Sequence, residues 1–312
     1  MKILIGYDGS VCSESALDDL ARAGLPEAGE FLVMSIAEVW LPSENFAPET
    51  NEQTSPYVEE ITRKHWEKNK KAVAEVETLA NHAAGRLRKM FPAWTVSAEG
   101  TYGSPAWEIL TKAVEWKPDL IVAGSHGRGS VGRFFLGSIS QKLVTEAHCS
   151  VRVARGRIEV DPTPTRVVIG FDGSQGAQAA VEAVTRRNWR KGSEFRLITA
   201  IEQVAPAAIE RFVPPIADWV EDEIRAERKL AEKLAEGALK TLCRAGFCAA
   251  QVVQAGNPKT VLIEEAEKWG ADVIFVGANR YGSRIGRFLL GSTSAAAAAR
   301  AHCSVEVIRK QS

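Results

Sequence analysis

A glycine-rich stretch near the middle of the chain has the residue types and the spacing needed to hold a phosphate group. It follows the apolar run 120–123, which is typical of a buried parallel strand, and it precedes a helix expected over 139–148. Glycines let backbone N–H groups approach a ligand closely, and a helix N-terminus adds unpaired donors and a partial positive charge. The stretch therefore predicts an anion-binding site, with a simple surface connection as the alternative.

The spacing of these glycines separates the stretch from two common phosphate-binding loops. A P-loop ends in Gly-Lys-Ser/Thr, whereas Gly137-Ser138 is preceded by Leu136. A Rossmann loop would follow the first strand, which here ends in Tyr7-Asp8-Gly9-Ser10. The pattern Gly124-x2-Gly127-x9-Gly137-Ser138 instead resembles the ATP-binding signature of the universal stress protein family.

Length and composition limit the class of protein. A chain of 312 residues predicts about two domains. The 39 basic and 39 acidic residues balance, so no attraction to nucleic acid or to an anionic membrane is expected. Neither a signal peptide nor an apolar run of membrane-spanning length is evident, and the five cysteines include no C-x-x-C pair. We expect a cytoplasmic protein without a metal site, a nucleic-acid partner or a membrane partner.

The chain contains an internal repeat. Residues 5–10 recur as 169–174, at an offset of 164, and 148–151 recur as 302–305, at an offset of 154. A repeat of this length indicates two whole domains, which we place at 1–156 and 165–312, with a linker over 155–165.

Each repeat alternates strands and helices. In the first repeat we expect strands over 2–7, 31–38, 96–101, 120–123 and 151–154, and helices over 10–23, 58–91, 105–116 and 139–148. Alternating β and α elements with short connections predict an α/β fold, with a parallel sheet covered by helices on both faces.

The resemblance to the universal stress protein family extends over nearly the whole chain. It implies two tandem flavodoxin-like (Rossmann-type) domains, each with a five-stranded parallel sheet of order 3-2-1-4-5, and it implies ATP binding. By resemblance, Asp8, flanked by Tyr7 and Gly9, contacts the adenine or ribose, and Ile36 packs on the adenine. The nucleotide-binding set is completed by loop residues that contact the ribose and phosphates: Gly124, Gly127, Arg128, Gly137 and Ser138. Asp8 as a helix cap and Ile36 as a core residue remain alternatives.

Other residue types in and near the loop do not form a catalytic group. Arg128 and Arg133 either contact phosphate or are solvated. His126 has no paired carboxylate or serine in view, so we interpret it as a surface residue. Cys149 and Cys303 occupy equivalent small buried positions, where redox chemistry is not expected. No catalytic residue is predicted, although Mg²⁺ could accompany the ATP.

The second repeat departs from the loop pattern. Arg280 stands where the second glycine should be, and one residue is inserted before Gly291. We expect a weaker second site around Asp172, Gly277, Gly291 and Ser292, and one ATP bound in the first half.

The two halves are expected to pair as an intramolecular pseudo-dimer through their fifth strands. Arg152 and Glu306 occupy equivalent positions in these strands, and their opposite charges suit cross-strand neighbours. A homodimer and an unidentified protein partner remain open.

Three functions follow from this reading. The leading hypothesis is a cytosolic ATP-binding protein that acts in stress response or signalling through nucleotide-dependent interactions. The alternatives are a slow ATP hydrolase, for which the sequence names no base, and a nucleotide-free scaffold.

Overall fold

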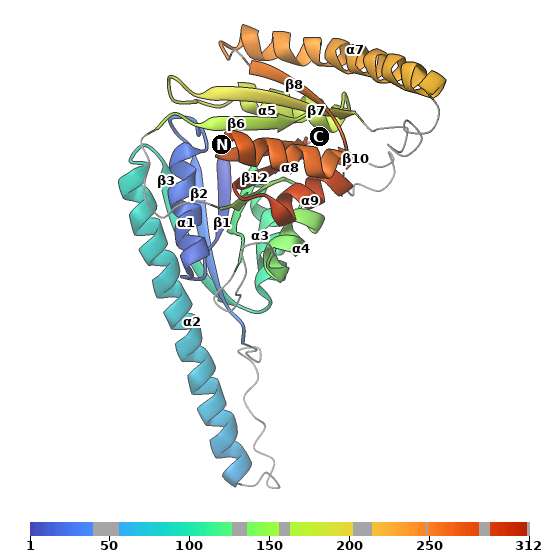
Figure 1. Cartoon of the computed structure of the whole chain (residues 1–312). Coiled ribbons are helices and arrows are strands. Elements are labelled where there is room, and N and C mark those ends of the chain that lie inside the picture. Colours follow the sequence, from blue (N-terminus) through green and yellow to red (C-terminus); the bar gives the residue numbers. More distant parts are fainter. Residues whose placement is uncertain are drawn as a thin grey trace.

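A computed structural model of the chain (Figure 1) describes residues 1–39, 56–126, 136–155, 163–201, 214–247, 249–280 and 288–310. The first half consists of β1 (Lys2–Gly6), α1 (Val11–Asp19), the short 3₁₀ helix η1 (Leu20–Arg22), β2 (Glu30–Ala37), α2 (Pro56–Met90), β3 (Thr95–Tyr102), α3 (Pro105–Trp116), β4 (Leu120–Gly124), α4 (Ser138–Glu146) and β5 (Ser150–Ala154). The predicted elements are all present, and their ends differ from the predicted ends by a few residues.

The second half repeats this order. It consists of β6 (Arg166–Gly170), α5 (Gln175–Thr185), β7 (Glu194–Ile201), α7 (Pro214–Arg244), β8 (Ala249–Ala255), α8 (Pro258–Trp269), β9 (Val273–Gly277), α9 (Ser292–Arg300) and β12 (Ser304–Ile308). Between β9 and α9 it adds a two-stranded antiparallel pair, β10 (Asn279–Arg280) and β11 (Phe288–Leu289), which the sequence analysis did not predict.

Ten of the strands form one continuous sheet. Their order is β3-β2-β1-β4-β5-β12-β9-β6-β7-β8, so each half has the predicted order 3-2-1-4-5. The neighbours within each half are parallel, whereas β5 and β12 pair antiparallel, with Arg152 opposite Glu306. The predicted pairing of the fifth strands is therefore confirmed.

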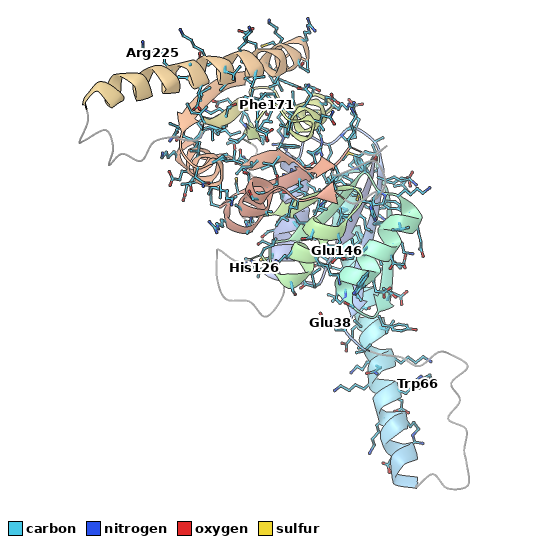
Figure 2. All side chains as sticks on the ribbon, turned by 90° about the vertical axis from the view of Figure 1, so that its right-hand side faces the viewer. Glu38, Trp66, His126, Glu146, Phe171 and Arg225 are labelled. Carbon is cyan, nitrogen blue, oxygen red and sulfur yellow. The ribbon has the colours of Figure 1, made fainter. Side chains whose placement is uncertain are left out.

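Helices cover both faces of this sheet (Figure 1). One face carries α3, α4, α8 and α9, and its core is continuous across the two halves, with Leu4, Ile121, Val151, Val153, Ile274 and Val305 among its members. The other face has two separate cores, one beneath α1 and α2 and one beneath α5 and α7. The α2 helix extends beyond the sheet at its N-terminal end, where Trp66 is half-exposed (Figure 2).

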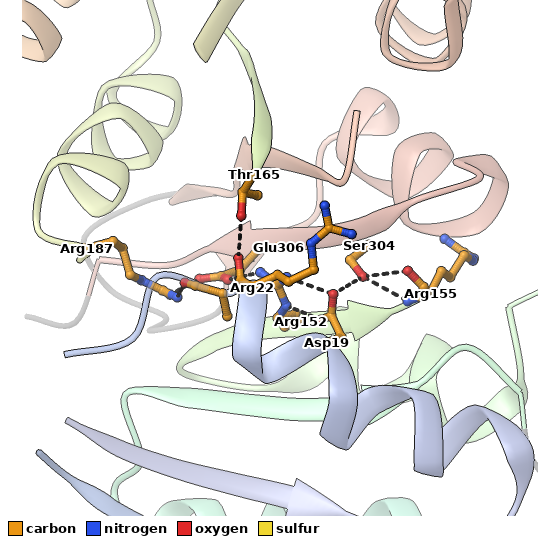
Figure 3. Close-up of polar contacts among 9 residues, drawn as sticks. Asp19, Arg22, Arg152, Arg155, Thr165, Arg187, Ser304 and Glu306 are labelled. Atoms are coloured by element: carbon orange, nitrogen blue, oxygen red, sulfur yellow. Dashed lines mark hydrogen bonds and ion pairs between the residues drawn. The ribbon is translucent and has the colours of Figure 1, made fainter. Parts of the chain in front are cut away.

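Buried charged side chains fill the space between these two separate cores (Figure 3). Arg152 donates from Nε to Asp19 Oδ2 at 2.6 Å and from Nη1 to Glu306 Oε2 at 3.0 Å. Arg187 donates to the other oxygen of Glu306, and it also donates to the carbonyl of Ala23. The network thus joins α1 and β5 of the first half to β12 and the end of α5 in the second half.

Arg155 corrects the predicted extent of the linker. We assigned it to a linker over 155–165, but its side chain is buried. Its backbone N–H donates to Ser304 Oγ at 2.9 Å, and its Nη2 donates to the carbonyls of Ala298 and Ala299 at the end of α9. The residue is therefore part of the contact between the halves.

Candidate functional site

The expected nucleotide site lies where the strand order reverses, between the carboxyl ends of β1 and β4. These two strands are neighbours in the sheet, and the chain leaves them in different directions, into α1 and toward α4. Ligands of open α/β sheets bind at such a switch point. Asp8 and Gly124 both lie at this edge, as the sequence analysis expected.

Asp8 and Gly9 form a tight turn that leads into α1. Asp8 Oδ1 accepts a hydrogen bond from the Ser10 N–H at 3.0 Å, and Gly9 has a φ of 71°, which favours glycine. The helix itself is capped by Ser10, whose hydroxyl accepts from the Ser13 N–H. Asp8 is therefore not the N-cap, and among the described residues its Oδ2 has no hydrogen-bond partner.

Tyr7 and Ile36 have different exposures at this edge. The Tyr7 side chain is buried, and its hydroxyl donates to the Glu14 carboxylate. Its backbone N–H and carbonyl are bound to Met34 and to the Ser35 hydroxyl, respectively. Ile36 is half-buried near the end of β2 and packs on the core shared by the two halves, which leaves part of its side chain for contact with a ligand.

The two ends of the glycine loop are tied together. The Gly137 N–H donates to the Ser125 carbonyl at 2.8 Å, and the Ser140 hydroxyl donates to the Gly124 carbonyl at 2.6 Å. Gly137 is the N-cap residue of α4, and no side chain caps that helix. The N-terminus of α4, which includes Ser138, is therefore held at the edge of the sheet without side-chain acceptors for its first N–H groups.

Gly124 is required by packing as well as by position. A Cβ atom at this residue would lie 2.7 Å from the backbone carbon and oxygen of Cys12, closer than side chains come to backbone. The absence of a side chain lets the first turn of α1 lie directly against the end of β4.

His126 has a serine partner, which corrects our prediction that none was in view. Its Nδ1 lies 3.0 Å from Ser125 Oγ, and Ser125 Oγ lies 3.9 Å from Cys12 Sγ. Burial lowers the pKa of His126, and the positive charge of Arg155 lowers it further. Ser125 was not predicted as a site residue, because a single serine beside a histidine is too common a pair to signal a site.

Three of the candidate loop residues lie outside the described part of the chain. They are Gly127, Arg128 and Arg133. Their assignment as nucleotide ligands stays a prediction.

The equivalent edge of the second half differs in several residues. Asp172 forms the same turn, with Oδ1 accepting from the Ser174 N–H at 2.9 Å, but it is exposed. Ala200 stands where the first half has Ile36, and Arg280 pairs with Phe288 in the β10–β11 ladder. Gly291 begins α9 with no side-chain cap, so the helix start at Ser292 is shared with the first half.

Among the described residues, no group of three or more histidine, cysteine or acidic side chains is placed to hold a metal ion. Burial raises the pKa of the Cys149 and Cys303 thiols to about 12, which keeps both thiols protonated at neutral pH. Within the same part of the chain, no helix combines the length and the apolar character needed to span a membrane.

The sequence is similar to those of a known protein family. The sequence profile of the universal stress protein family matches residues 1–155 and again residues 164–309. The chain belongs to the universal stress protein family. A universal stress protein of Mycobacterium tuberculosis is 27% identical over 314 residues, which covers 99% of this chain and 97% of that protein.

Two further relatives show the same family at different lengths. A universal stress protein of Thermus aquaticus is 35% identical over 153 residues, covering 49% of this chain and 97% of its own length. The crystal structure of a universal stress protein from Archaeoglobus fulgidus matches 99% of this chain and 98% of its own, with a TM-score of 0.59 and 18% identity. This structure shows that the tandem arrangement has the fold of the family.

Proposed function

We propose that this universal stress protein binds ATP at the edge between β1 and β4 and acts in stress response or signalling through nucleotide-dependent interactions in the cytoplasm. The observation that carries the proposal is the start of α4. Its first N–H groups, which no side chain among the described residues caps, are held beside the ends of β1 and β4 through the Gly137–Ser125 and Ser140–Gly124 hydrogen bonds. Backbone donors placed in this way suit the anionic oxygens of a phosphate chain.

The remaining candidate residues suit the other end of a nucleotide. Asp8 offers a carboxylate oxygen to ribose hydroxyls or to the adenine, and the half-buried Ile36 offers an apolar surface for the base. Along the edge of the sheet, Ile36 on β2 comes first, Asp8 after β1 is next, and α4 lies beyond β4. This order matches that of the base, ribose and phosphates in a nucleotide. Mg²⁺ would accompany the ATP as its phosphate-bound counterion.

We propose that the first half holds the high-affinity site. Ala200 offers less apolar contact than Ile36, and the antiparallel ladder at Arg280 occupies the backbone groups that follow β9. Two or three lost hydrogen bonds to charged phosphate, at roughly 1.5–3 kcal/mol each, would weaken binding by about two to six decades. Arg280 recovers part of this loss if it pairs with a phosphate.

Two measurements on the purified full chain test this function. Mass spectrometry of the ligand released on denaturation is expected to detect an adenine nucleotide, and protein freed of ligand is expected to bind added ATP. Protein that carries no nucleotide and binds none would instead be the nucleotide-free scaffold. Prolonged incubation with labelled ATP is expected to leave the ATP intact. Steady release of ADP by the purified protein would indicate the slow hydrolase.

A further inference from the structure

Arg155 places a buried positive charge beside the proposed nucleotide site without a carboxylate to balance it. Its side chain is 9% exposed, and Nη2 is held by the carbonyls of Ala298 and Ala299 at 2.6 and 3.1 Å. The Nε and Nη1 donors are buried and have no partner among the described residues, and no acidic residue there forms an ion pair with this guanidinium. Buried charges are ordinarily paired, because an unpaired charge is costly away from water.

The neighbours of Arg155 belong to the glycine-loop edge. Gly124 of β4 is opposite Ala154 of β5 in the sheet, so the next residues, Ser125 and Arg155, leave neighbouring strands side by side. His126 follows, and its Nε2 is also buried without a partner in the part of the chain that the structure describes. When the Ser125 hydroxyl donates to Nδ1, the Nε2 atom carries the proton and is a further donor.

We propose that Arg155 and His126 form a binding site for a phosphate oxyanion at the carboxyl ends of β4 and β5. Three donors without partners, Arg155 Nε and Nη1 and His126 Nε2, suit the several acceptor oxygens of a tetrahedral anion. The phosphate is either the end of the phosphate chain of bound ATP, in which case this inference rests on the proposed function, or free inorganic phosphate.

The second half of the chain provides an internal comparison. Arg309 is the equivalent of Arg155 in the second half. It also binds the opposite half through backbone carbonyls, those of Val144 and Cys149. Beside it, however, Ala278 and Asn279 replace Ser125 and His126, and Gly176 replaces Cys12. The pair of a buried guanidinium and a partly buried imidazole therefore belongs to the first half alone. The hydrogen bonds of Arg309 to the opposite half form without such an imidazole beside them.

The lowered pKa of His126 agrees with this arrangement. Burial and the charge of Arg155 both favour the neutral imidazole in the free protein. An oxyanion between the two groups would offset both effects and raise that pKa. Binding of the anion should therefore take up protons, and it should strengthen as the pH falls from 8 toward 6.

Calorimetric titration of the full chain with inorganic phosphate, with AMP and with ATP tests the site. Arg155→Met and His126→Ala are expected to weaken phosphate binding about tenfold to a hundredfold, the loss expected for hydrogen bonds to a charged group. Arg309→Met removes the equivalent hydrogen bonds between the halves and is expected to leave phosphate binding unchanged. If Arg155→Met fails to fold, His126→Ala, whose side chain does not bond to the second half, carries the test.

The nucleotides distinguish the two sources of phosphate. If the variants lose affinity for ATP but keep their affinity for AMP, the site binds the end of the phosphate chain. If they lose affinity for inorganic phosphate alone, the site binds a free oxyanion. Binding of phosphate that depends on Arg155 in a protein that binds no nucleotide would support the site and contradict the proposed function. Phosphate and ATP affinities unchanged in both variants, or an unaltered chain that binds neither phosphate nor ATP, would overturn the inference.

Discussion

Gly137 begins α4 with a φ of −61° and a ψ of 152°, which are angles that any residue adopts. In this it differs from Gly9, whose positive φ favours glycine, and from Gly124, whose Cβ atom would collide with the backbone of α1. Folding therefore explains the glycines at positions 9 and 124. The backbone angles give no such reason at position 137, where the proposed function assigns the glycine to the close approach of a phosphate to the start of α4.

The substitution Gly137→Val tests this distinction. The side chain would stand between the α4 N-terminus and a phosphate, so we expect ATP affinity to fall by at least about tenfold, the cost of one or more hydrogen bonds to a charged group. Calorimetric titration measures the affinity, and circular dichroism checks the fold.

Gly291→Val is the matched control for this substitution. Gly291 begins α9 with nearly the same angles, and the nearest atom to an added Cβ is Ser294 Oγ at 3.9 Å, an ordinary contact. Each variant replaces a glycine N-cap with valine, so α4 and α9 lose a similar small amount of capping stability. Equal ATP affinity in the Gly137 variant and the unaltered protein would show that the phosphate does not bind at α4.

The sequence predicted the candidate residues that depend on chain order, and it missed those that depend on packing. Asp8, Ile36 and Gly124 lie at the predicted edge because each is within two residues of the end of a strand of clear pattern. Arg155 was assigned to a linker because it follows the last strand of the first repeat. Only the pairing of β5 with the second half, a contact between residues far apart in the sequence, buries it.

At the scale of elements, β5 and β12 join the two halves in an antiparallel pair. Their valines face the shared core, and the charged residues between the valines face the opposite side. Glu306 is fully buried there and accepts hydrogen bonds from Arg152 and Arg187. Arg152 also pairs with Asp19 within the first half, and Arg187 pairs with Glu306 within the second half, so the Arg152–Glu306 ion pair is the one in this network that joins the two strands.

Removal of one charge from this network should destabilise the whole chain. For Glu306→Gln, the free energy of unfolding is expected to fall by about 3–5 kcal/mol, because Arg187 and Arg152 then remain buried with a single carboxylate, that of Asp19. Urea denaturation followed by tryptophan fluorescence gives the change.

Glu236→Gln is the control on the surface of α7. Its ion pair with Lys240 spans 3.5 Å between two exposed side chains, and the expected loss is below about 1 kcal/mol. A similar small loss in both variants would mean that the network does not hold the halves together.

The elements themselves were predictable because their apolar periodicity is strong, but the β10–β11 ladder was not. Each of its strands has two residues, which is too short for a pattern of alternation. It forms at the position where the second repeat carries Arg280 and an inserted residue. The insertion was visible in the sequence, whereas the ladder depends on how the two ends of the loop meet.

At the scale of the whole molecule, the strands of the two repeats join in one ten-stranded sheet. The antiparallel register is symmetric about the Arg152–Glu306 pair, so two first halves pairing in this way would place Arg152 against Arg152. Opposite charges at equivalent positions thus favour pairing of the first half with the second half within one chain. The two repeats differ at the interface, where Arg152 is opposite Glu306. They also differ at the glycine loop, where the second repeat carries Arg280 and an inserted residue.

The number of ATP molecules bound per chain tests the central claim of one site in the first half most directly. Calorimetric titration of nucleotide-free protein with ATP is expected to give one high-affinity site per chain, which Gly137→Val removes and Gly291→Val leaves unchanged. Two sites of equal affinity, or a single site that is lost in the Gly291 variant and kept in the Gly137 variant, would contradict the account.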